Sequence, residues 1–253
     1  MKKIKEIIKD YKLLLRSIPG LVTMMFCISV VVMNLMANKI IFNSKLVAVD
    51  GGIILSWIPF LCMDVITQRY GPKAAIKMNI LALLVNLMFV LVFALVSSLQ
   101  IEIGDAYQQG DAFKSFDTVF SYTWFVLLGS SIAFLASGII NNSLNWAVGK
   151  LFKKKPDGKL AYFTRSYVST FIGQFADNLL FAVIVFMLFA PIYWGYSLTI
   201  VQCIGSAIIG AILELITEAI FSPIGYRVFK KWQLENVGED YITYSKTKKL
   251  KVK

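Results

Sequence analysis

Residues 169–186 read STFIGQFADNLLFAVIVF, a stretch apolar enough to lie in a lipid bilayer that nevertheless contains Gln174, Asp177 and Asn178. About 20 consecutive apolar residues are needed for a helix to cross the hydrocarbon core. A carboxylate at the centre of such a helix costs about 2.5–3.5 kcal/mol on insertion scales, so it usually marks a functional path rather than a neutral position. The stretch therefore predicts a membrane helix and places a candidate site within it.

The composition of the whole chain supports a membrane protein. Of 253 residues, 57% are hydrophobic and 16% are charged, and the mean hydropathy is +0.68. Soluble domains carry about 25% charged residues. We predict an all-α, multi-pass integral protein of the cell membrane, of bacterial type.

Six apolar runs are long enough to cross a bilayer. They are residues 20–42, 52–68, 75–99, 118–149, 166–190 and 196–221. We therefore expect residues 20–221 to form a six-helix transport domain, preceded by a basic cytoplasmic segment (1–19) and followed by a basic cytoplasmic tail (222–253).

The charged residues orient these spans. Most of the 26 basic residues lie in residues 1–16, 69–77, 150–165 and beyond 221, whereas the loop between the third and fourth spans holds four acidic residues, Glu102, Asp105, Asp111 and Asp117. By the positive-inside rule both termini are cytoplasmic. Basic blocks between apolar runs fit membrane orientation better than a phosphate-binding face, so the net charge of +11 predicts no direct nucleic-acid partner.

Several classes of chemistry are disfavoured. The chain has no histidine, and its three cysteines lie in apolar runs without a CxxC pair. A histidine-based catalytic triad and the usual zinc sites are therefore excluded. With no visible nucleophile–base pair, we predict no enzyme activity, no cofactor and no metal.

Polar residues occur in five of the six spans, which favours a central polar cavity. Asp64, Asp177 and Glu214 are the strongest candidates because they lie away from the expected helix ends. Arg165 and Glu218 lie near predicted cytoplasmic ends, where long side chains can reach the interface. The candidate substrate-binding residues are Asn38, Lys39, Asp64, Gln68, Asn142, Arg165, Gln174, Asp177, Asn178 and Glu214.

Two correspondences suggest that the chain consists of two inverted three-helix halves. Asn34 and Asn38 repeat the four-residue spacing of Asn141 and Asn145. Asp64 and Asp177 occupy the second span of each half. Inverted repeats are a common plan among transporters, with substrate held near the bilayer midplane.

Carboxylates and amides suit a ligand that presents several N–H donors, with Lys39 as a countercharge or a donor. A guanine-like ring fits, because one carboxylate can accept from its ring N–H and its exocyclic amine. A cation, an amino acid or a vitamin fits the same residues equally well.

The sequence resembles the queuosine precursor transporters, also called the VUT family of vitamin uptake transporters. The resemblance rests on DVITQRYGPKAA (64–75), RSYVSTFIGQFADNLLFAVIVF (165–186) and ELITEAIFSPIGYRVFK (214–230). It implies six helices that import 7-deazaguanines such as preQ0, preQ1 or queuine for tRNA modification. It also implies that Asp177 recognises the ring, with Asp64, Gln174, Asn178, Lys39 and Glu214 as neighbours.

Two positions depart from the family pattern, and both remove negative charge. Gln68 stands where relatives often have an acid, and the fourth span offers Asn141, Asn142 and Asn145 where relatives tend to carry a Gln and an Asp. The exact precursor is therefore left open.

The transport mode also has an alternative. A substrate-binding subunit of an energy-coupling-factor importer, for a vitamin or purine-like compound, is of similar size. Such subunits tend to have a small-residue A-x-x-x-A face on the first helix, whereas the first span here is bulky, GLVTMMFCISVVVMNLMANKI (20–40). We therefore favour a stand-alone importer whose partners are the small-molecule substrate and the lipid bilayer, and a homodimer is compatible with the sequence.

Overall fold

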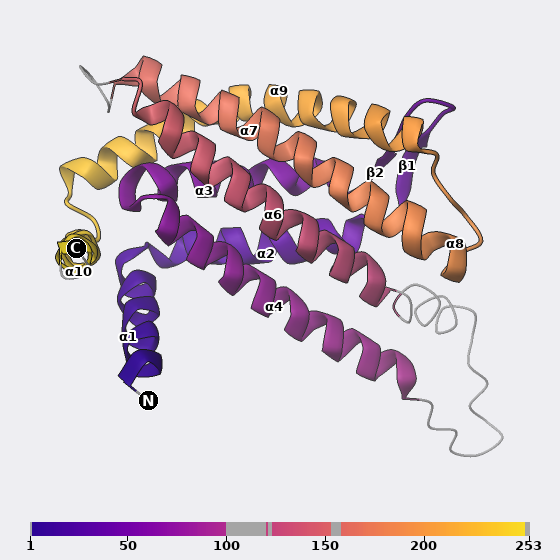
Figure 1. Cartoon of the computed structure of the whole chain (residues 1–253), viewed down its shortest axis with the longest axis horizontal. Coiled ribbons are helices and arrows are strands. Elements are labelled where there is room, and N and C mark those ends of the chain that lie inside the picture. Colours follow the sequence, from indigo (N-terminus) through magenta and orange to yellow (C-terminus); the bar gives the residue numbers. More distant parts are fainter. Residues whose placement is uncertain (1, 100–119, 121–122, 153–157, 251–253) are drawn as a thin grey trace.

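The structure is a computed structural model that describes residues 2–99, 120, 123–152 and 158–250 (Figure 1). Its long helices are α2 (Gly20–Met36), α3 (Ile53–Tyr70), α4 (Pro72–Ser98), α6 (Thr123–Gly149), α7 (Lys159–Phe181) and α9 (Ile200–Leu234). A π-helical segment, η1 (Ala182–Phe189), and α8 (Ala190–Tyr193) extend α7. The remaining elements are α1 (Lys2–Ser17), α10 (Glu239–Leu250) and the strands β1 (Ile40–Asn43) and β2 (Ala48–Asp50).

The long helices form a bundle in which successive helices run in opposite directions. Both chain ends lie at one end of the bundle, together with α1 and α10 (Figure 1). The β1–β2 hairpin and α8 lie at the opposite end. The two ends are called the terminal end and the hairpin end below.

Within the part of the chain that the structure describes, four segments are long and apolar enough to cross a membrane: Pro72–Ser98, Trp124–Gly149, Lys159–Tyr193 and Ile200–Leu234. A fifth is possible if Ile4–Ser17 and Gly20–Met36, which meet at 105°, count as one broken span. The prediction of an all-α membrane protein is confirmed. The count of six spans stays a prediction, because α3 is not among these segments. The cytoplasmic location of the termini also stays a prediction, because the acidic loop that helped to orient the chain lies outside the described residues.

Several boundaries differ from those expected. The first span ends at Met36 because the chain turns into the hairpin, which pairs Asn43 with Ala48 in antiparallel register. The last helix continues to Leu234, well past the expected end at 221. The basic N-terminal segment is helical, and Lys77 joins α1 to α10 by contacting Asp10 at 2.5 Å and the Tyr241 hydroxyl at 3.0 Å.

Helices α6 and α7 pack closely where they position the site. A Cβ added at Gly173 would lie 2.9 Å from the Asn141 Cβ and 3.2 Å from a Phe60 ring carbon. In lipid, helices associate through close van der Waals packing and hydrogen bonds, since apolar surface gains nothing by leaving one apolar solvent for another. Glycine at 173 therefore sets the separation at which polar groups on the two helices meet.

Gly173→Ala should lower the free energy of unfolding by about 1–3 kcal/mol, as overpacked core positions do. Gly20→Ala is the matched control, because its Cβ would meet nothing within 4 Å. Thermal unfolding of both variants in detergent measures the difference. Equal midpoints would contradict the close approach of α6 and α7.

Candidate functional site

Two groups of polar residues lie at different depths of the bundle. The first, the hairpin cavity, is lined by Met33, Asn34, Ala37, Asp50, Gly52, Ile53, Ser56, Ser130, Asp177, Asn178, Phe181 and Glu214. The second, the buried carboxylate cluster, consists of Asp64, Asn141, Asn145, Arg165, Ser166, Ser169 and Glu218, all buried. Both groups combine side chains from α3, α6, α7 and α9.

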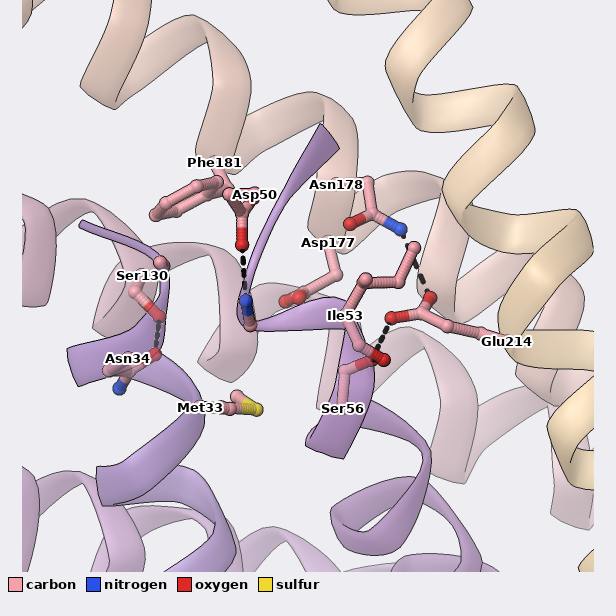
Figure 2. A pocket seen from close by; sticks show the side chains of 12 residues that line it. Met33, Asn34, Asp50, Ile53, Ser56, Ser130, Asp177, Asn178, Phe181 and Glu214 are labelled. Carbon is pink, nitrogen blue, oxygen red and sulfur yellow. Dashed lines mark hydrogen bonds between the residues drawn. The ribbon is translucent and has the colours of Figure 1, made fainter. Parts of the chain in front are cut away.

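Glu214 joins three helices at the hairpin cavity. Figure 2 shows its carboxylate between Asn178 of α7 and Ser56 of α3. The Asn178 amide donates to Glu214 Oε2 at 3.1 Å, and the Ser56 hydroxyl donates to Oε1. On α6, the Ser137 hydroxyl donates to Asp177 Oδ1 at 2.7 Å.

The hairpin cavity is strongly acidic. Asp50, Asp177 and Glu214 lie close enough to interact electrostatically with one another. Among the described residues that line the cavity, none is lysine or arginine. Burial raises the pKa of Asp50, on the strand β2, to about 6, although a hydrogen bond from the Gly52 N–H opposes the shift. Such a lining favours a cation or a ligand rich in N–H donors.

The cavity is small in this conformation. Its volume is about 30 Å³, enough for about one or two water molecules. The hairpin is fastened to α9 at two points: the Ala48 N–H donates to Ser206 Oγ at 2.9 Å, and Gln202 Nε2 donates to the Ser44 carbonyl at 3.0 Å. Binding of a larger ligand therefore requires the surrounding elements to separate.

In the buried carboxylate cluster, Asp64 accepts hydrogen bonds on both oxygens. Oδ1 receives the amides of Asn145 at 2.8 Å and Asn141 at 3.3 Å, and the Ser169 hydroxyl at 3.4 Å. Oδ2 contacts the Ser166 hydroxyl, which also contacts Glu218 Oε1. These contacts join α3, α6, α7 and α9.

The structure divides the ten predicted site residues among several environments. Asp177, Asn178 and Glu214 line the hairpin cavity, whereas Asp64 and Arg165 belong to the buried carboxylate cluster. Asn142 lies near that cluster and accepts from Thr67 at 2.9 Å. Their role in binding substrate stays a prediction.

The other four predicted residues lie outside these contacts. Gln174 is fully buried, and neither of its amide atoms has a hydrogen-bond partner. Gln68 is half-buried with an unpartnered Nε2. Asn38, just beyond the end of α2, donates to the Leu35 carbonyl of that helix, and Lys39 is exposed at the start of the hairpin. Lys39 therefore does not line the cavity whose charge it was expected to balance.

The structure corrects the expectation that Arg165 and Glu218 reach the membrane interface. Arg165 is 7% exposed, and its Nε donates to the Asn145 carbonyl at 3.1 Å. Glu218 is fully buried. Because α9 continues to Leu234, Glu218 lies in the helix interior rather than near an end.

Sequence reasoning also missed Asp50 and the serines that contact the carboxylates. Asp50 lies in a connection between apolar runs, so no span pattern pointed to it. Ser56, Ser137 and Ser166 are common in membrane helices and carry no distinctive signal. Their roles appear only where a carboxylate from another helix reaches them.

Apolar helices around a small, carboxylate-lined cavity define this chain as an integral membrane protein with a polar site in its interior. Residues 50–228, more than half of the chain, match the family model described as "Putative vitamin uptake transporter". The chain belongs to this family, which confirms the resemblance found in the sequence. A transporter family supports a non-enzymatic role. No curated protein and no solved structure matches the chain significantly.

Asn145→Ala should lower the free energy of unfolding by about 1.5–3 kcal/mol, because it removes a hydrogen bond to a buried carboxylate. Asn38→Ala is the matched control and should change stability by less than about 0.5 kcal/mol, since the Asn38 amide donates to a nearby backbone carbonyl rather than to a buried carboxylate. Unfolding midpoints in detergent compare the two variants. A larger loss for Asn38→Ala would contradict the assigned contacts.

Proposed function

We propose that the protein imports a 7-deazaguanine precursor of queuosine, such as preQ0, preQ1 or queuine, across the cell membrane and holds it in the hairpin cavity. The observation that carries the proposal is the cavity lining, which combines Asp50, Asp177 and Glu214 with the amides of Asn34 and Asn178. Membership of a vitamin uptake transporter family supports transport.

The chemistry of a 7-deazaguanine suits this lining. Its ring N–H and exocyclic amine lie on one edge and can donate together to a carboxylate, for which Asp177 is our candidate. Its carbonyl needs a donor, and the Asn34 amide nitrogen is buried without a partner. Phe181 offers an aromatic contact, and stacking of a base on such a ring contributes about 1–3 kcal/mol in nucleic-acid complexes.

The excess of carboxylates favours precursors that carry an amine. The aminomethyl group of preQ1 and the secondary amine of queuine are cationic at neutral pH, whereas the nitrile of preQ0 is uncharged. A cation beside Asp50 or Glu214 would offset the repulsion among the three carboxylates. We therefore expect preQ1 or queuine to bind more tightly than preQ0.

Transport by this site requires alternating access, in which one part of the bundle moves against the other around a central ligand. At the hairpin end, the two contacts between the hairpin and α9 must break for the cavity to open. Toward the terminal end, Asp64 and its donors close the path. If the hairpin contacts and the Asp64 contacts open one at a time, the ligand can enter from one side of the membrane and leave on the other.

A second mode is that of a substrate-binding subunit of an energy-coupling-factor importer. The exposed face of α2 bears Leu21, Met24, Met25 and Ile28, which are bulky rather than small. Because such subunits tend to have small residues on this face for docking a partner, the bulky residues here support a stand-alone importer. The purified protein in proteoliposomes separates the two modes, because the subunit would bind a ligand but move none.

Asp177→Asn should abolish uptake of labelled preQ1 or queuine into proteoliposomes while leaving the protein folded, because the amide removes the anionic acceptor. Asp240→Asn is the matched control, since Asp240 is exposed on α10 and should leave uptake unchanged. Gel filtration and thermal unfolding check that both variants are intact. Normal uptake by Asp177→Asn would mean that this carboxylate does not bind the ring.

A further inference from the structure

We propose that Asp64, Ser166 and Glu218 form a proton-binding site in the membrane interior, with the proton held on Glu218 and transferable to Asp64 through the Ser166 hydroxyl. The three residues come from α3, α7 and α9 and meet in the buried carboxylate cluster. The proposal goes beyond the proposed function, because it concerns how movement is driven rather than which ligand is carried.

Ser166 contacts two carboxyl groups with a single hydroxyl. Its hydroxyl lies within hydrogen-bonding distance of both Asp64 Oδ2 and Glu218 Oε1. A serine hydroxyl has one hydrogen to donate and two lone pairs that accept. It can therefore donate to only one of the two carboxyl groups. The other contact is attractive only if that carboxyl carries a proton and donates it to Ser166 Oγ.

The surrounding donors decide which carboxyl holds the proton. Asp64 receives Asn141, Asn145 and Ser166, which together place donors on both of its oxygens and satisfy it as an anion. Glu218 has only the Ser166 contact among the described residues, and its Oε2 is buried without a partner. An ionised carboxylate with so few donors is costly in a dry interior. Glu218 is therefore the protonated member.

The charges around the pair agree with one bound proton. From α7, Arg165 interacts electrostatically with Asp64 and Tyr162 with both carboxyl groups, and from α3, Cys62 interacts with Glu218. From α6, Asn141 and Asn145 are neutral donors. With Tyr162 and Cys62 neutral, ionised Asp64 is balanced by Arg165, and a proton on Glu218 leaves the group without net charge.

The proton moves by a balanced exchange. The O–H bond of Glu218 breaks as its proton passes to Ser166 Oγ, while the original Ser166 hydrogen passes to Asp64 Oδ2. The product is ionised Glu218, neutral Asp64 and an unchanged serine. If the proton then leaves the site, Asp64 and Glu218 repel each other across the contact of α3, α7 and α9.

The two polar groups of the bundle share their helices. Glu214 of the hairpin cavity lies one helical turn from Glu218 on α9. Between Ser166 and Asp177 on α7 lie Thr170 and Gln174, which are fully buried and retain unpartnered polar atoms. A change in the distance between Asp64 and Glu218 would therefore be transmitted to the hairpin cavity along α7 and α9.

Infrared spectroscopy of the purified protein tests the site without any transport assay. A protonated carboxyl has a C=O band distinct from that of a carboxylate, and the band shifts in deuterated water. We expect Glu218→Gln to lose one such band at neutral pH and the exposed control Glu235→Gln to match the wild type. Retention of the full acid absorption in Glu218→Gln would overturn the assignment.

A labelled wild-type sample covers the case in which a variant fails to fold. With ¹³C in the glutamate side-chain carboxyls, a proton on Glu218 requires an acid band that shifts with the label. The absence of any labelled acid band at neutral pH would overturn the proposal.

A transport assay then shows whether this proton drives ligand across the membrane. In proteoliposomes, Glu218→Gln should lose the accumulation of ligand that an imposed proton gradient produces in the wild type, and Glu235→Gln should keep it. Gradient-driven accumulation by Glu218→Gln would overturn the coupling role. If the wild type moves none of the deazaguanines, the proposed function fails, and the infrared result still decides the proton site.

Discussion

A carboxylate within a bilayer has no water to solvate it, so the protein must supply its hydrogen-bond donors from other helices. The rest of this structure depends on that constraint. Asp64 is satisfied by α6 and α7, and Glu214 by α3 and α7. Apolar side chains alone give little drive for helix association in lipid. The buried acids therefore define how the helices are rotated about their axes and how deep each lies.

In each of the two polar groups, an aspartate on one three-helix half lies near asparagines on the other half. Asp64, on the second long helix of the first half, meets Asn141 and Asn145 on the first long helix of the second half. Asp177, on the second long helix of the second half, shares the hairpin cavity with Asn34 of α2. Inverted three-helix halves would produce such a pattern. The repeat itself stays a prediction.

The hairpin cavity combines a high density of negative charge with very little space. An empty, fully formed purine site would be larger, since pockets for small ligands are typically about 300–1,000 Å³. The proposed ligand therefore requires a more open conformation than this one, in which its own N–H groups replace the serines and amides that now contact the carboxylates.

The sequence by itself determined the apolar helices, the membrane class and the family, because hydrophobicity over about 20 residues is a local property. It also identified Asp64, Asp177 and Glu214, since a carboxylate in an apolar run stands out without any structure. Only the tertiary structure decided that Asp64 and Asp177 lie in different groups, that Lys39 is exposed, and that Glu218 is buried beside Ser166. It also brought Asp50 into the cavity by folding the connection after α2 into a hairpin. The physical reason is that the donors of a buried carboxylate come from helices far away in the chain, and only the packing of those helices determines which of them it meets.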